Sequence, residues 1–126
     1  PVDPGAAPPT LDLGPTHLPR TLAALRKGVE VKGACAPECQ VTASLSVNRR
    51  VARRLGLGSR MLLSKAEIWS GGSEASSGTV HLRLTRTLRR ALRLYRGKAF
   101  EIRVLVEAER GGLETSQELT SLIAVR

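Results

Sequence analysis

Residues 100–110 read FEIRVLVEAER and form the longest alternating segment of the chain. Every second residue from Phe100 to Ala108 is apolar, and charged residues occupy most of the positions between them. A period of two places the apolar side chains on one face of a β-strand. This segment therefore predicts a long strand with one buried face and one solvent-exposed face.

Other segments with the same alternation lie on both sides of this strand. Gly111 and Gly112 predict a tight hairpin, followed by a return strand that carries Leu119, Ile123 and Val125. Upstream, 40–47 (QVTASLSV) places Val41, Ala43, Leu45 and Val47 on one face. Shorter or less regular segments of this kind are 10–16, 29–35, 60–69 and 80–84. About seven strands at such spacings are typical of a mainly β, two-sheet sandwich.

Two Arg-rich segments interrupt the alternation and have helical spacing instead. Residues 48–57 (NRRVARRLGL) and 85–96 (TRTLRRALRLYR) each begin at a polar N-cap residue and group their apolar side chains on one helical face. Residues 19–27 (PRTLAALRK) predict one or two further turns, closed by Gly28. Because both Arg-rich segments follow an alternating strand, we expect them to be two short helical crossovers, one from each half of the sandwich.

Length and composition indicate one domain with an aliphatic core. The 126 residues are 41% hydrophobic but only 2% aromatic. Residues 1–9 (PVDPGAAPP) predict an extended tail or linker, and 10–126 the sandwich domain. No apolar run reaches the roughly 18 residues of a membrane-spanning helix, so none is expected. The start at Pro1 fits a mature chain after signal-peptide removal, or a trimmed fragment.

The chain has two cysteines, Cys35 and Cys39, in the sequence CAPEC between two alternating segments. Positions that flank such a turn lie near the Cα separation of a disulfide. A redox site usually has two residues between its cysteines, and a zinc site needs four ligands. We expect a structural disulfide rather than a metal site or free thiols, and therefore an oxidising compartment.

No residue set indicates catalysis or a bound cofactor. His17 and His81 are isolated, and no serine lies in a Gly-x-Ser-x-Gly motif. Glu107 and Glu109 share a strand face, where paired carboxylates are far more often solubilising charges than an acid–base pair. We therefore expect a protein that is not an enzyme and that uses neither cofactor nor metal.

The chain carries a net charge of +9, and arginine dominates its basic residues. This excess either reflects a GC-rich genome, with solvated helix faces, or forms an anion-binding surface. The possible anion-binding residues on the two Arg-rich segments are Arg49, Arg50, Arg53, Arg54, Arg86, Arg89, Arg90, Arg93 and Arg96.

From residue 22 to 126 the sequence resembles the immunoglobulin-like or fibronectin-like β-sandwich modules of secreted or surface proteins from GC-rich actinobacteria. The segments that carry the resemblance are 28–47 (GVEVKGACAPECQVTASLSV), 49–57 (RRVARRLGL), 79–93 (TVHLRLTRTLRRALR) and the final hairpin from Phe100. In such modules the close cysteine pair resembles a strand-joining disulfide. The turn at 109–113 (ERGGL) departs from the common Asp-x-x-Gly-Asn type.

The resemblance implies a non-enzymatic module at the cell surface or outside the cell: a spacer, an adhesive or a subunit of a surface assembly. Its expected partners are proteins, through self-association or contact with neighbouring surface-protein domains. The alternative is a cationic binding module that takes nucleic acid or another polyanion on its Arg-rich helices.

Overall fold

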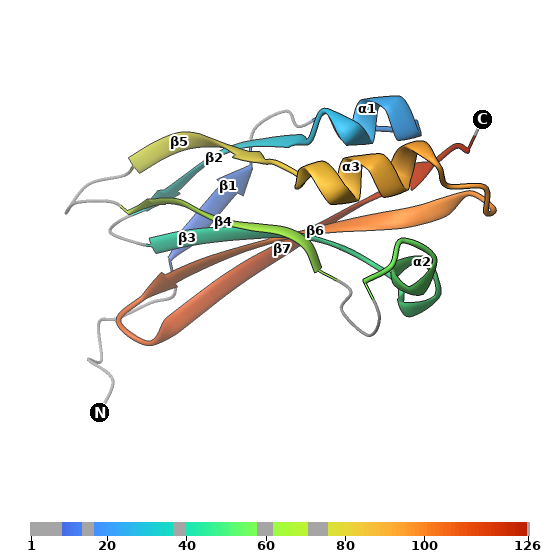
Figure 1. Cartoon of the computed structure of the whole chain (residues 1–126). Helices are drawn as coiled ribbons and strands as arrows, with labels where there is room; N and C mark the ends of the chain where they lie inside the picture. The colour runs from blue at the N-terminus through green and yellow to red at the C-terminus, as the bar shows by residue number, and fades with distance from the viewer. Residues whose placement is uncertain (1–8, 14–16, 37–39, 58–61, 71–75, 126) are drawn as a thin grey trace.

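The computed structural model describes residues 9–13, 17–36, 40–57, 62–70 and 76–125. The described chain is mainly β, with two antiparallel sheets and three short helices (Figure 1). Its strands are β1 (Thr10–Leu13), β2 (Val29–Ala36), β3 (Gln40–Val47), β4 (Leu62–Ser70), β5 (Ser76–Leu82), β6 (Phe100–Arg110) and β7 (Leu113–Ile123). Its helices are α1 (Leu22–Arg26), α2 (Arg49–Arg54) and α3 (Arg86–Arg93).

The strands are divided between a three-stranded and a four-stranded sheet. The first has the order β1-β2-β5 and the second the order β4-β3-β6-β7. Buried side chains from both sheets belong to one hydrophobic cluster, which shows that the sheets pack on each other around a common core.

The alternation in β3 and β6 builds the centre of that core. All four predicted inward residues of β3 and all five of β6 are buried, with exposed fractions of 3% or less. The register pairs Ala43 with Val106 and Leu45 with Val104, so the two apolar faces form one surface. Burying each Leu or Val of this kind stabilises the fold by about 1.5–3 kcal/mol. The prediction of an aliphatic core is confirmed.

The predicted hairpin between β6 and β7 is also confirmed. Gly111 and Gly112 have φ values of +58° and +83°, and the strand residues on either side, Arg110 and Leu113, pair directly. A two-residue turn with positive φ at both positions is the turn that matches the natural strand twist.

Each of the three helices begins at an N-cap residue, and the sequence predicted two of these caps, Asn48 and Thr85. The side chains of Thr21, Asn48 and Thr85 accept hydrogen bonds from backbone N–H groups three residues later, at 3.1, 2.9 and 3.2 Å. In α3, Leu88 and Leu92 are buried while the arginines are exposed. No helix in the described residues is long and apolar enough to cross a membrane.

One expectation about the helices is wrong. α3 joins β5 to β6 and so passes from one sheet to the other, as predicted, but α2 joins β3 to β4 within the four-stranded sheet. The shared pattern of strand, cap and Arg-rich turn sets the local helix. It does not determine which sheet receives the next strand, because strand pairing depends on distant residues.

Strand β7 is tied to the N-terminal segment by side-chain hydrogen bonds. Thr115 Oγ1 donates to the carbonyl of Pro9 (2.6 Å), and Gln117 Nε2 donates to that of Leu11 (2.9 Å). Further along, Ser121 Oγ donates to the carbonyl of Pro19 (2.7 Å). Pro9, placed in the tail by the sequence, is therefore buried against the sheets.

The predicted disulfide lies only partly within the described residues. Cys35 is 1% exposed at the end of β2, opposite Leu11, and no described cysteine is free. Cys39 lies outside the described residues, so its pairing with Cys35 stays a prediction. The described residues hold no group of three or more His, Cys, Asp or Glu that could bind a metal ion.

Candidate anion-binding face

Helices α1 and α3 lie side by side at one end of the molecule (Figure 1). Between them is a hollow of about 270 Å³. Three arginines and a mainly apolar set of residues line it: Leu22, Ala23, Arg26, Leu92, Arg93, Tyr95, Arg96, Gly97 and Val125.

Short local signals fix the two helices that form this hollow. α1 ends at Arg26 and is followed by Gly28, whose φ is +91° and at which a Cβ would lie 2.7 Å from the carbonyl oxygen of Leu82. Only glycine fits there, so the chain turns from Arg26 directly into β2. In α3, Arg89 and Arg93 are four residues apart and share a face, as does Arg96 just after the helix.

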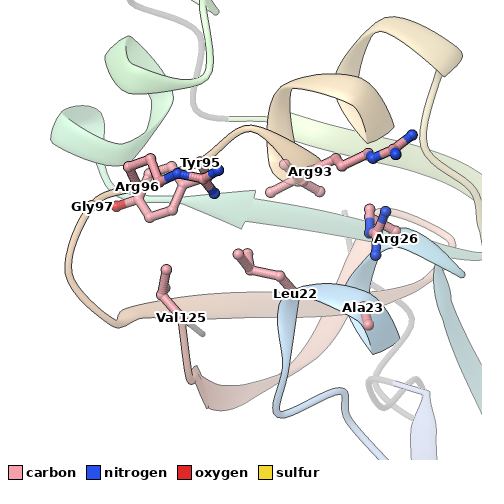
Figure 2. Close-up of a pocket in the computed structure, with 9 residues that line it drawn as sticks. Leu22, Ala23, Arg26, Arg93, Tyr95, Arg96, Gly97 and Val125 are labelled. Atoms are coloured by element: carbon pink, nitrogen blue, oxygen red, sulfur yellow. The ribbon is translucent and has the colours of Figure 1, made fainter.

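The three arginines surround the hollow from two elements. Figure 2 shows the side chains of Arg26, from α1, and Arg93, from α3, near one end, with Arg96 beside Tyr95 at the other. The Nε of Arg26 is buried and has no hydrogen-bond partner. A buried donor without an acceptor costs about 1–3 kcal/mol, so the Nε of Arg26 is an unsatisfied group at the lining of this hollow.

Within the described residues, the charged side chains of α1 and α3 form no ion pair with a carboxylate. The ion pairs of the described residues join Glu30 to Lys32 and His81, and Arg103 to Glu101 and Glu118. None of them involves the basic residues of α1 or the exposed arginines of α3. The positive charge on these helices is therefore balanced only by solvent.

A second hollow adjoins the first and shares Arg26 with it. Its volume is about 410 Å³, and its lining is Arg26, Lys27, Arg83, Leu84 and Arg89. Together the two hollows define the α1–α3 face, whose basic residues are Arg26, Lys27, Arg83, Arg89, Arg93 and Arg96.

The predicted anion-binding residues contribute unequally to this face. Arg89, Arg93 and Arg96 line its hollows, whereas Arg86 and Arg90 are exposed on α3 without lining either one. The exposed arginines of α2 line neither hollow: Arg49, Arg50, Arg53 and Arg54.

Sequence analysis missed three residues of the face: Arg26, Lys27 and Arg83. The prediction of helical turns over 19–27 already placed two of them at the end of a helix. What the sequence did not indicate is that this helix packs on α3. Arg83 could not be assigned because it lies in the short link between β5 and α3.

Tyr95, the neighbour of Arg96 in the sequence, is held in place by packing and by a hydrogen bond. Its ring is 7% exposed and meets the ring of Phe100 edge-on, with centroids 5.1 Å apart at 70°. Its hydroxyl donates to the carbonyl of Lys98 at 3.2 Å. A Cβ at Gly97 would lie 2.3 Å from this hydroxyl, so the absence of a side chain there lets the loop close over the ring.

The residues that line the first hollow are suited to holding an anion. Guanidinium groups can grip a carboxylate, sulfate or phosphate through two parallel hydrogen bonds. The apolar side chains of Leu22 and Val125 offer contacts for a hydrocarbon part of the same ligand. The lining contains no carboxylate, imidazole or thiol that could act as a base or nucleophile.

A comparison of the sequence with models of known protein families finds no match, and neither does a comparison with curated proteins.

Proposed function

We propose that the chain is a non-enzymatic interaction module that recognises an acidic group of a partner on its α1–α3 face. One observation carries the proposal. Arginines from two separate helices line a common hollow whose described lining contains no carboxylate. If these arginines only kept the helix surfaces in water, those of α1 and α3 would not need to line the same hollow.

The proposal includes an immunoglobulin-like or fibronectin-like sandwich of seven strands. The strand order supports it. The sheets β1-β2-β5 and β4-β3-β6-β7 match the immunoglobulin constant-type arrangement except for the fourth strand, which here belongs to the other sheet. Modules of this class work as spacers, adhesives or subunits of assemblies on cell surfaces, and we assign this chain to that role.

The proposed location is outside the cell or at its surface. It rests on the cysteine pair, since a disulfide between Cys35 and Cys39 persists only in an oxidising compartment. The burial of Cys35 at a strand end agrees with a structural rather than a reactive cysteine.

Retention on an immobilised polyanion tests the α1–α3 face. The variant Arg93→Gln/Arg96→Gln removes two of its arginines, and Arg49→Gln/Arg50→Gln removes the same charge from α2. On heparin-agarose we expect the first variant to elute at clearly lower salt than the second. Equal elution would mean that retention follows net charge alone, and it would overturn the proposed face.

A second candidate function is binding of nucleic acid or another polyanion. The observation that favours it is the continuity of the face over two adjoining hollows. Its signature is an affinity for a DNA duplex that falls with salt by about 0.9 logarithmic units for each phosphate contacted. A salt dependence smaller than the value for one phosphate contact would exclude nucleic acid and leave an acidic protein surface as the partner.

A further inference from the structure

The far end of the four-stranded sheet carries a hollow of opposite charge. It measures about 220 Å³ and lies at the β6–β7 hairpin end. Three glutamates and two polar residues line it: Glu107, Glu109, Glu114, Gln40 and Thr42, with Ala108 between them. These side chains belong to the outer face of the sheet, whose inner face holds the core. We call this region the acidic hairpin end.

The glutamates of the acidic hairpin end repel one another. Glu109 of β6 lies directly opposite Glu114 of β7, and Glu107 is two residues away on the same face. Like charges in directly opposed positions destabilise a sheet. Within the described residues these three glutamates form no ion pair, whereas Glu101 and Glu118 on the same sheet both pair with Arg103.

The two charged regions lie at opposite ends of one strand. The α1–α3 face is beside Phe100, where β6 begins, and the acidic hairpin end is beside Arg110, where β6 ends. At about 3.3 Å per residue, this strand separates the regions by roughly 30 Å. Figure 1 shows α1 and α3 at one end of the molecule and the hairpin at the other. A contact between the two regions therefore requires two copies of the chain.

We propose that the α1–α3 face binds the acidic hairpin end of a second copy, so that copies join head to tail. The inference rests on the proposed function and names its partner. Each region lacks the charge that the other supplies: among the described residues, Arg93 and Arg96 line the basic hollow without an ion pair, and the opposed Glu109 and Glu114 lack a cation. The glycines at the tip of the hairpin add no bulk, so its glutamates can approach a concave surface.

In a head-to-tail dimer, one copy keeps a free α1–α3 face and the other keeps a free acidic hairpin end. Such a heterologous contact can repeat and produce a row of copies rather than a closed dimer. The net charge of +9 opposes close approach, and exposed ion pairs are individually weak. The association is therefore weak, sensitive to salt, and best observed at high protein concentration.

Sedimentation velocity tests the proposal. The wild type is measured over a concentration series at about 0.01 M and about 1 M salt, where the Debye length is roughly 30 Å and 3 Å. We expect species larger than a monomer only at low salt. A face variant, Arg93→Gln/Arg96→Gln, and a hairpin variant, Glu109→Gln/Glu114→Gln, should each associate about tenfold more weakly, the effect of losing two exposed ion pairs.

Two matched controls separate the contact from general charge effects. Arg49→Gln/Arg50→Gln removes the same charge from α2, and Glu101→Gln/Glu118→Gln removes it from the same sheet away from the acidic hollow. Both should associate like the wild type. The face variant has a lower net charge and therefore less general repulsion, so weaker association of this variant cannot come from net charge.

Mixing the two variants gives the sharpest outcome. The hairpin of the face variant is intact and so is the face of the hairpin variant, so a mixture contains one competent contact. The mixture should form a dimer and stop there, while the wild type continues to larger species. A monomeric wild type, unimpaired single variants or a monomeric mixture would each overturn the proposal. If self-association fails but heparin retention still depends on Arg93 and Arg96, only the head-to-tail contact is overturned. If heparin retention does not depend on them either, the proposed function is overturned as well.

Discussion

Thr115 in β7 donates a 2.6 Å hydrogen bond from its Oγ1 to the carbonyl oxygen of Pro9, a residue 106 positions earlier in the chain. Gln117 and Ser121 make equivalent bonds to Leu11 and Pro19. By the alternation of β7, these residues lie on the same strand face as Leu119 and Ile123. They are polar because the surface they face is the backbone of the N-terminal segment.

The first prediction concerns this bond. Thr115→Val keeps the shape of the side chain but removes the donor and leaves the carbonyl of Pro9 without its side-chain partner. We expect the free energy of unfolding to fall by about 1–2 kcal/mol in urea denaturation. Thr115→Ser should retain most of the stability, and Ser116→Ala, on the exposed face, should change little. A Val variant as stable as the wild type would show that the bond adds nothing.

The second prediction concerns Gly97. Its substitution by Ala would bring a Cβ to 2.3 Å from Oη and 2.5 Å from Cζ of Tyr95. The loop or the ring must shift, which we expect to cost about 1–3 kcal/mol of stability. Because Arg96 lies on this loop, Gly97→Ala should also lower the salt needed to elute the folded protein from heparin-agarose. Lys98→Gln removes a neighbouring charge without the clash and serves as the control for stability.

The third prediction concerns the turn between β6 and β7. A Cβ at Gly111 or Gly112 would meet nothing within 4 Å, so only the positive φ resists substitution. Gly112→Val should lower the free energy of unfolding by about 1–2 kcal/mol. Gly111→Asn should have little effect, because Asn tolerates this conformation and Asn-Gly favours the same turn. The measurement is the melting temperature of each variant. A lower melting temperature for Gly111→Asn than for Gly112→Val would show that the turn is assigned wrongly.

The fourth prediction concerns Cys35 and Cys39. If they are bonded, neither should react with iodoacetamide in denaturant until a reductant is added, as measured by intact mass. Replacing both by Ala should lower the free energy of unfolding by about 2 kcal/mol, the chain-entropy value for so short a loop. Alkylation of two thiols without reductant would refute the disulfide and remove the basis for the proposed location.

The elements that the sequence predicted well are those controlled by neighbouring residues. The alternation of β6 and β3 was enough to assign their buried faces, because a half-buried strand needs an apolar side chain at every second position. The caps at Asn48 and Thr85 and the turn at Gly111 depend on local hydrogen bonds and backbone conformations. Such features can be recognised without knowing the rest of the fold.

The features that the sequence did not predict depend on residues far apart in the chain. The position of β4 beside β3 is decided by pairing along two strands, not by the Arg-rich turn between them. Likewise, the α1–α3 face exists because the packed fold brings Arg26 and Arg93 to the lining of one hollow. Their own segments carry ordinary amphipathic patterns that identify two helices but not their contact.

The ties between β7 and the N-terminal segment also bear on mechanical load. The two segments run in the same direction, since Pro9, Leu11 and Pro19 meet Thr115, Gln117 and Ser121 in ascending order, and Thr21 forms a parallel bridge with Ala124. A force that pulls the first residues and the last residues apart acts along both segments in opposite directions. It therefore stretches these bonds together in shear instead of opening them one at a time, a geometry suited to a module that carries tension between its ends.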